Sequence, residues 1–225
     1  MRRFIWLITL SSAFAAVAFL SRSPADAHPH VQIKVETAVI VEHGAAIGFR
    51  HRWTFDKAYL ASVLEEFDGD GDRKLDASER AKLLAHTRDT LKRFGSFTVA
   101  WAKAGKLKLK PAEEIRMTFE HDVPVLQFSI NLAKPTALAA NGFRFEVYDA
   151  TYFSAFRFAG ASAVWFAGPA PSDCTLTIKR PDEGEQLMAY RRFIKEFGPM
   201  AAALVAPAMV VAMCPEQDKP AGTTE

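Results

Sequence analysis

The stretch at residues 68–79 reads DGDGDRKLDASE and is the most distinctive motif of the chain. Acidic residues occupy its first, third, fifth, ninth and twelfth positions, which is the ligand spacing of a calcium-binding helix-loop-helix. Alternate residues of such a tight loop turn inward, so their oxygens converge on one hard cation. The predicted ligands are five carboxylates and one main-chain carbonyl, at Asp68, Asp70, Asp72, Lys74 (the carbonyl), Asp76 and Glu79.

Both flanks of the stretch carry apolar residues at helical spacing, and Leu75 in its eighth position is the apolar residue that docks such a loop. We therefore predict an EF-hand-like helix-loop-helix over residues 54–95. The sixth position, where the sharp turn favours glycine, is Arg73, and a non-glycine residue at positive φ costs roughly 1 kcal/mol, which weakens the expected calcium affinity. The alternative is a solvated acidic turn between two helices. The periodic residues are Phe55, Tyr59, Val63 and Phe67 upstream and Leu83, Leu84, Leu91 and Phe94 downstream.

Residues 1–27 have the composition of a signal peptide. Arg2 and Arg3 precede an uncharged, mostly apolar run, and residues 25–27 read ADA, the small-residue pattern that a signal peptidase recognises. We expect cleavage after Ala27 and a periplasmic or secreted location. An uncleaved membrane anchor is the alternative, because the apolar run approaches spanning length.

The mature chain is long enough for one domain or two small ones. Removing residues 1–27 leaves 25 basic and 25 acidic residues. A net charge near zero argues against nucleic acid or an anionic membrane surface as a partner. The apolar run at 200–213 contains Pro207 and is too short to span a membrane, so no stable span is expected after processing.

Cys174 and Cys214 are the only cysteines of the chain. In an oxidising compartment this even count predicts one disulfide, which would close a loop of about 40 residues. Two buried free thiols or a soft-metal pair are the alternatives. We expect the strand at 209–214 to lie beside the strand at 174–181.

Cleavage after Ala27 would make His28 the N-terminal residue, followed by Pro29 and His30. The terminal amine, the imidazole of His28 and the imidazole of His30 suit copper, nickel, cobalt or zinc. Pro29 has no backbone N–H to lose, which excludes the binding mode that uses deprotonated amides. The site therefore needs a further ligand from the fold, and His121 beside Asp122 is the best candidate.

The other histidines, His43, His51 and His86, each have a structural explanation. His43 precedes Gly44 in a turn, His51 alternates along a strand where it is equally explained as a surface residue, and His86 lies on the second helix of the loop motif. The chain has no GxSxG motif, no phosphate-binding glycine loop and no serine or cysteine with an evident catalytic partner. We therefore do not expect an enzyme.

The remaining segments predict antiparallel sheets in a sandwich-like α+β fold. Alternating apolar residues on both sides of Gly44 predict a hairpin. A second hairpin is predicted about residues 104–105, and residues 143–159 read as a core strand in which Asp149 serves a turn or a site. An amphipathic helix is expected at 183–197, and residues 216–225 as a disordered tail. The predicted strands lie at 31–43, 46–55, 97–101, 106–110, 115–122 and 125–132.

Five segments in combination resemble a known family: HPHV after the cleavage point, WTFD, the acidic DxDxD loop, YDATYF and CTLTIKRP. On these, the mature chain from residue 28 to residue 215 resembles domain-of-unknown-function family 1007. The resemblance implies a periplasmic component of uncharacterised ABC-type transport systems, found beside or fused to nickel/cobalt-type permeases. The family pattern has WTFDE and a glycine in the acidic loop, whereas this chain has WTFDK and Arg73.

These observations predict an exported accessory protein of a divalent transition-metal (nickel, cobalt or zinc) transport system, with calcium in its acidic loop. Its expected partner is a membrane metal permease or ABC-type transporter. One alternative is a copper-dependent enzyme that uses the N-terminal histidine site with a third nitrogen ligand. The other is a calcium-stabilised binding module in which the histidines carry no metal.

Overall fold

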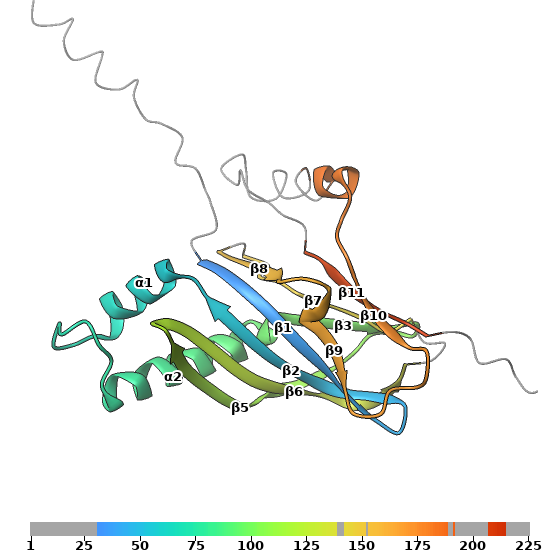
Figure 1. Cartoon of the computed structure of the whole chain (residues 1–225), viewed down its shortest axis with the longest axis horizontal. Helices are drawn as coiled ribbons and strands as arrows, with labels where there is room; N and C mark the ends of the chain where they lie inside the picture. Colours follow the sequence, from blue (N-terminus) through green and yellow to red (C-terminus); the bar gives the residue numbers. More distant parts are fainter. Residues whose placement is uncertain (1–30, 139–141, 152, 189–190, 192–206, 215–225) are drawn as a thin grey trace, which may run out of the picture.

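A computed structural model describes residues 31–138, 142–151, 153–188, 191 and 207–214 as two β-sheets with a pair of helices at one end (Figure 1). The helices α1 (Lys57–Phe67) and α2 (Ala77–Arg93) are inserted between the second and third strands. The larger sheet has the order β5 (Leu109–Glu120), β6 (Val123–Ala137), β2 (Ala45–Phe55), β1 (Val31–Glu42) and β8 (Ser154–Phe158), with β9 (Val164–Ala167) also paired to β1. The smaller sheet has the order β10 (Thr175–Lys179), β11 (Met209–Met213), β7 (Arg144–Val147), β3 (Thr98–Ala102) and β4 (Gly105–Lys106).

The predicted first hairpin is confirmed. β1 and β2 pair antiparallel, and the two turn residues His43 and Gly44 both have positive φ, at 47° and 73°. Two consecutive positive φ values are what a two-residue hairpin turn of the favoured hand requires. The alternating apolar residues of both strands then face the same side of the sheet.

The larger sheet is mixed, so the prediction of purely antiparallel sheets was wrong. β8 and β9 both pair with β1 in parallel, one after the other along its free edge. β1 is 12 residues long and offers room for both short strands on the side that β2 does not use. The partners lie more than 100 positions away in the sequence, and a period of two along each strand does not specify which neighbour it takes or in which direction.

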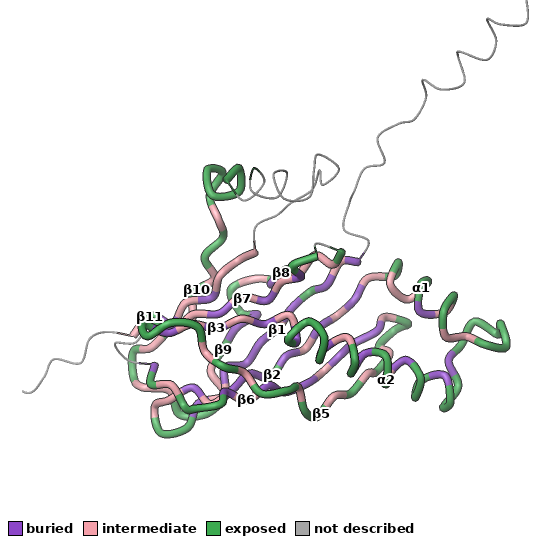
Figure 2. Tube along the Cα trace, turned by 180° about the vertical axis from the view of Figure 1, so that it is seen from behind, coloured by how far each residue is buried: buried purple, intermediate pink, exposed green. Residues whose placement is uncertain are grey.

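The inner faces of the two sheets share one core (Figure 2). Phe49 and Phe128 from the larger sheet and Phe145 from the smaller one are each 1% exposed or less. Phe49 and Phe145 have ring centroids 4.9 Å apart, which joins the two layers directly. The sandwich-like arrangement follows from each sheet having one apolar face to bury.

Four local predictions were wrong in their boundaries. The aromatic segment at 143–159 is divided into β7 and β8 by a turn, instead of forming one strand. The strand predicted at 106–110 is divided between the end of β4 and the start of β5, and β3 begins at Thr98 after a short 3-10 helix, η1 (Gly95–Phe97). A second 3-10 helix, η2 (Ala161–Ala163), lies between β8 and β9. β5 ends at Glu120, so His121 lies in the following turn.

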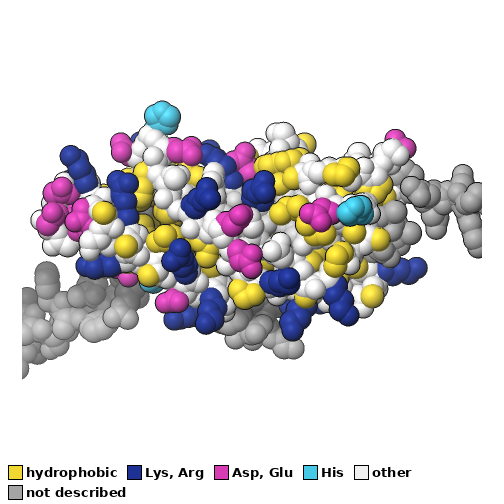
Figure 3. Space-filling model, turned by 90° about the horizontal axis from the view of Figure 1, so that it is seen from below, with side chains coloured by type: hydrophobic (Ala, Val, Ile, Leu, Met, Phe, Trp, Pro, Cys, Tyr) yellow, Lys and Arg dark blue, Asp and Glu magenta, His cyan; other side chains and the backbone are white. Residues whose placement is uncertain are grey.

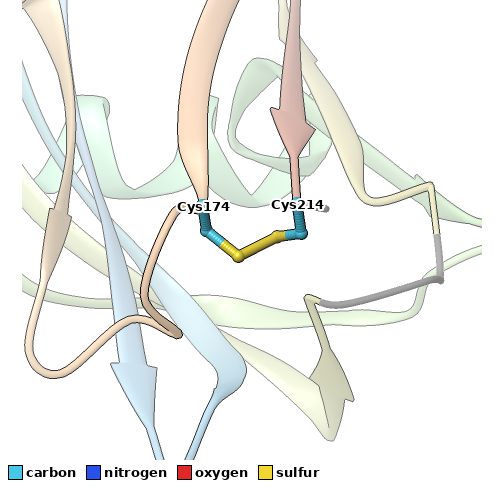
Figure 4. The surroundings of a disulfide bond; sticks show 2 residues. All are labelled: Cys174 and Cys214. Carbon is cyan, nitrogen blue, oxygen red and sulfur yellow. A yellow bond between two sulfur atoms is a disulfide. The ribbon is translucent and has the colours of Figure 1, made fainter. Parts of the chain in front are cut away.

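The predicted pairing of the last two strands is confirmed. β10 and β11 are antiparallel, and a disulfide joins Cys174 to Cys214 at their ends with a Cα–Cα distance of 4.1 Å (Figure 4). A disulfide indicates that the protein folds in an oxidising compartment. Within the described residues, no helix has the length and apolar character needed to cross a membrane.

Three predictions fall wholly or mainly on residues that the structure does not describe. The signal peptide with its cleavage site after Ala27 and the tail at 216–225 lie outside the described residues. Of the predicted amphipathic helix, residues 183–188 are helical, and most of the rest lies outside them as well.

Candidate metal centre

The loop between α1 and α2 is built from its own carboxylates. Asp68 closes the first turn, because its Oδ1 accepts from the Gly71 amide at 2.8 Å and its Oδ2 from the Arg73 amide at 2.8 Å. Glu79 closes the other side, where its Oε1 accepts from the Gly69 amide at 2.6 Å. The loop amides of Gly69, Gly71 and Arg73 have no partner in either helix, and these carboxylates accept their hydrogen bonds.

Three of the six predicted ligands come together. Oxygens of Asp68, Asp70 and Glu79 all lie within 4.8 Å of one another, the one such group that the described residues contain. Carboxylate oxygens at this separation are the hard donors that calcium prefers. Figure 3 shows acidic side chains gathered at the end of the molecule that carries this loop.

The charge in this group is only partly neutralised by hydrogen bonds. The carboxylate of Asp70 accepts from the Asp72 amide at 3.1 Å, which lowers its pKa. The nearby carboxylates of Asp72, Asp68 and Glu79 act the other way, and the pKa of Asp70 is raised overall. Like charges close together disfavour ionisation, and a cation between them would relieve that repulsion.

The remaining predicted ligands are not part of this group. Asp72 Oδ1 accepts from the Lys74 amide at 2.7 Å, and Asp76 is the N-cap of α2 with its Oδ1 on the Glu79 amide at 2.8 Å. Glu79 Oε2 in turn accepts from the Asp76 amide at 2.9 Å, which completes a capping box. Asp76 and Glu79 therefore also fix the start of α2, a role that the ligand spacing did not reveal.

Two details of the loop follow the sequence prediction. Arg73 has a φ of 64°, so the sixth position does adopt the conformation that glycine would take without strain. Leu75 is 6% exposed and packs with Val63 and Leu83 in a small separate core between the helices. The loop is thereby attached to the helices by one apolar side chain.

The histidines do not gather. His28 and His30 lie outside the described residues. His121 is exposed in the β5–β6 turn at a φ of 49°, separated from β1 by β6 and β2. His43 is exposed in the β1–β2 turn, and the ring of His86 lies edge-on to Phe67 with the centroids 5.6 Å apart.

His51 is the polar core residue whose environment the sequence did not decide. It is fully buried, with Nδ1 2.9 Å from Thr37 Oγ1 and Nε2 3.2 Å from Thr98 Oγ1. The Thr98 hydroxyl donates its proton to the Ser96 carbonyl, so it accepts from Nε2–H, and Nδ1 is left to accept from Thr37. Burial lowers the pKa of His51 to about 3. The sequence feature that indicated burial was the position of His51 between Phe49 and Trp53 in the alternation of β2.

An aromatic cavity of about 260 Å³ lies between the start of β1, α2 and the β7–β8 turn. Trp53, Phe97 and Phe156 form much of its wall, and Asp149 is among its polar lining residues. The indole Nε1 of Trp53 is buried and has no hydrogen-bond partner among the described residues. An apolar pocket with a few polar groups is the usual form of a small-ligand site.

Two facing β-sheets, an inserted pair of helices and a disulfide define a disulfide-bonded α+β protein. The chain belongs to the family described as "Protein of unknown function (DUF1007)", which matches residues 13–209. It is also 29% identical over 169 residues to a protein of Haemophilus influenzae named "Uncharacterized protein", covering 73% of this chain and 78% of that one. The family membership confirms the resemblance found in the sequence motifs.

Proposed function

We propose that this protein is an exported, non-enzymatic accessory of a transport system for a divalent transition metal such as nickel, cobalt or zinc. In this proposal the loop at 68–79 holds a calcium ion that stabilises the fold. The mature N-terminus, with His28 and His30, holds the transported metal. A membrane permease or ABC-type transporter is the partner that receives it.

The convergence of Asp68, Asp70 and Glu79 within 4.8 Å is the observation that carries the metal-binding proposal. All three are carboxylates, and Glu79 is 7% exposed, so its charge lies where water screens it least. Asp72, Asp76 and the Lys74 carbonyl are close in sequence and would complete the shell. Calcium is favoured over softer metals because every predicted ligand is an oxygen.

The transport role is supported by the N-terminal donor set and by the compartment. An amine and two imidazoles suit divalent transition metals and would compete poorly for calcium. The disulfide between Cys174 and Cys214 supports an extracytoplasmic location, and a periplasmic one is part of this proposal. The family membership supports nothing more specific than the fold, since that family has no stated activity.

Calcium binding is tested by thermal unfolding with and without the ion. Calcium should raise the Tm of the wild type and should leave the Tm of Glu79→Gln unchanged. Glutamine keeps the shape and the capping oxygen of Glu79 but removes the charge. Asp89→Asn removes an exposed carboxylate of α2 outside the loop and should respond to calcium like the wild type. A wild type that ignores calcium would remove this part of the proposal.

The transition-metal role is tested by native mass spectrometry of the protein purified from the exported fraction without added metal. We expect the mass of a chain that begins at His28, increased by the mass of one bound transition metal. The double variant His28→Ala, His30→Ala should lose that metal. The matched double variant His43→Ala, His121→Ala removes two exposed imidazoles and should retain it.

The second candidate function is a calcium-stabilised binding module without a transition metal. The aromatic cavity favours it, because such a pocket could take a small apolar ligand. Calcium-dependent melting with no response to nickel, zinc or copper would select this function over the transport role.

A further inference from the structure

The aromatic cavity has a negative charge in its wall and no positive charge to balance it. It lies where β8 runs beside the start of β1, with α2 on another side (Figure 1). Asp149 supplies a carboxylate, and no lysine or arginine is among the described residues that line the cavity. The other lining residues are apolar, aromatic or hydroxyl-bearing, with one histidine. A ligand that complements this wall therefore combines a positive charge with apolar surface.

Asp149 is a buried carboxylate without a counter-ion in the described part of the chain. It is 5% exposed, and none of the ion pairs between described residues includes it. Its Oδ1 accepts from the amide and the hydroxyl of Thr151 at 2.8 and 2.6 Å, and its Oδ2 accepts from the Ser154 amide at 3.0 Å. All three donors are neutral, and Oδ2 keeps one lone pair that no bond uses. A buried carboxylate usually has a charged partner or a metal.

A metal ion fits this cavity poorly. The group of metal-ligating side chains found among the described residues is the one in the acidic loop, and Asp149 is not part of it. His86 is the one other carboxylate, imidazole or thiol among the described lining residues. Aromatic rings cannot complete the shell of an inorganic ion, whereas their faces attract an organic cation.

The aromatic wall has the arrangement that such a cation needs. The ring of Trp53 has its centroid 5.9 Å from that of Phe97 and 4.8 Å from that of Phe156, and the ring planes are inclined by 70° and 67°. Phe97 and Phe156 are themselves 5.4 Å apart. Rings in different planes surround a bound group from more than one side, as in an aromatic cage. The attraction is greatest for tryptophan and where water is excluded.

The cavity can be entered from solvent and suits a small ligand. Phe94, just after α2, and Phe153, in the β7–β8 turn, both line it and are 41% and 55% exposed. They therefore mark its rim. The volume of the cavity is about 260 Å³. Pockets for drug-sized ligands have roughly 300–1,000 Å³, so the ligand here is smaller than those.

The number of free acceptors narrows the kind of cation. A primary ammonium group has three N–H donors, and burying a donor without a partner costs free energy. The Asp149 carboxylate has one lone pair left, and the wall around it is mainly aromatic. A methylated ammonium group has one N–H or none, and its methyl groups pack against the rings.

We infer that this cavity is a binding site for a small methylated ammonium compound. The cationic group lies against Trp53, Phe97 and Phe156, and the carboxylate of Asp149 balances its charge. Thr151 holds that carboxylate in position. This site goes beyond the proposed function, since its ligand is not a metal and the acidic loop takes no part in it.

The test is a calorimetric titration of the exported protein with two probes of the same shape. One is choline, and the other is its uncharged analogue, in which a tert-butyl group replaces the trimethylammonium group. At about pH 8 the histidines are neutral and the carboxylates ionised. The wild type should bind choline at least about tenfold more tightly than the analogue, because only choline carries the charge.

Four variants locate the binding site. Asp149→Asn should weaken choline binding about tenfold and leave the analogue unaffected, since it removes a charge and keeps the shape. Phe153→Ala opens the rim and should weaken both probes about fivefold. Trp165→Ala removes an aromatic ring of β9 that is 45% exposed and outside the cavity, and Asp122→Asn removes an exposed carboxylate of the β5–β6 turn. Both controls should bind choline as the wild type does.

Three results would overturn the inference. They are no choline binding by the wild type, equal affinity for the two probes, and choline binding that both Asp149→Asn and Phe153→Ala leave unchanged. If Asp149→Asn does not fold, the comparison of the two probes and the Phe153→Ala variant decide. Calcium and transition-metal binding are measured separately, by thermal unfolding and native mass spectrometry, so a failure here does not affect the proposed function.

Discussion

The acidic loop between α1 and α2 and the turn that carries Asp149 place carboxylates in opposite surroundings. Asp68, Asp70 and Glu79 lie within 12 positions of one another, and Asp70 is exposed to water. Asp149 stands alone at 5% exposed, and its surroundings come from β1, α2 and the β7–β8 turn. The acidic group of the loop comes from one short segment, whereas the surroundings of Asp149 exist only because distant strands meet.

The same difference separates the two cores. The helix-loop-helix has a small core of Val63, Leu75 and Leu83, all from residues 57–93. The sheets bury a much larger set in which neighbours in space are distant in sequence, such as Phe49 and Phe145. Changes in the sheets should therefore affect the whole fold, and changes in the loop should affect mainly the loop and the two helices beside it.

Acid should have the largest effect, and it should act on the sheets. Because the pKa of His51 is lowered to about 3, the unfolded chain binds this proton at higher pH than the folded one. Stability is then full above pH 6.5 and falls toward pH 3, by on the order of 5 kcal/mol from this group alone.

The free energy of unfolding in urea is measured between pH 7 and 5. This range lies above the usual pKa of Asp and Glu side chains, so the change in stability reports mainly on His51. The expected slope approaches about 1.4 kcal/mol per pH unit in the lower half of that range. His51→Gln should flatten it and His43→Gln, in an exposed turn, should not. A wild-type profile without slope would contradict a buried neutral His51.

Removing the disulfide should have the next largest effect, also on the sheets. The variant Cys174→Ser, Cys214→Ser removes the covalent link between two positions that are 40 residues apart. It should lower the free energy of unfolding by about 4 kcal/mol. Calcium affinity at the loop should stay unchanged, as measured by calcium titration at a temperature where both proteins are folded. A matching loss of calcium affinity would show that the two regions are not independent.

Leu83→Ala should destabilise the helix-loop-helix by about 3 kcal/mol, because Leu83 is 1% exposed in the small core. The local nature of that core predicts that hydrogen exchange rises in α1 and α2 more than in β1 and β2. Leu84→Ala, on the same helix and half-buried, is the control and should change little. Uniform loss of protection across both sheets would mean that the helices unfold only with the whole protein.

Arg73→Gly should have the smallest effect, and it should be stabilising. Glycine adopts the φ of 64° without strain, which gains roughly 1 kcal/mol. If that strain is relieved only in the calcium-bound loop, the gain appears as an approximately fivefold higher calcium affinity. Lys74→Gly, one position further, is the control. Weaker calcium binding by Arg73→Gly would show that the Arg73 side chain itself supports the site.

The loop shows how far the sequence alone could be interpreted. The spacing of Asp68, Asp70 and Glu79, the helical flanks and the positive φ at Arg73 were all predicted, because these features depend on neighbours within one or two turns. What the spacing missed is that Asp76 and Glu79 also cap α2. Capping and the proposed calcium ligation would use the same carboxylate oxygens, so the spacing of the acidic residues does not distinguish the two roles.

By itself the sequence determined the local elements: the β1–β2 hairpin, the helix-loop-helix and the acidic residues that its loop brings together. The tertiary structure alone decided the parallel strands on β1, the burial of His51 between two threonines and the meeting of Asp149 with the start of β1. Periodicity fixes which face of a strand is apolar. It does not fix the neighbour, since strand pairing depends on how the whole chain buries both sheets.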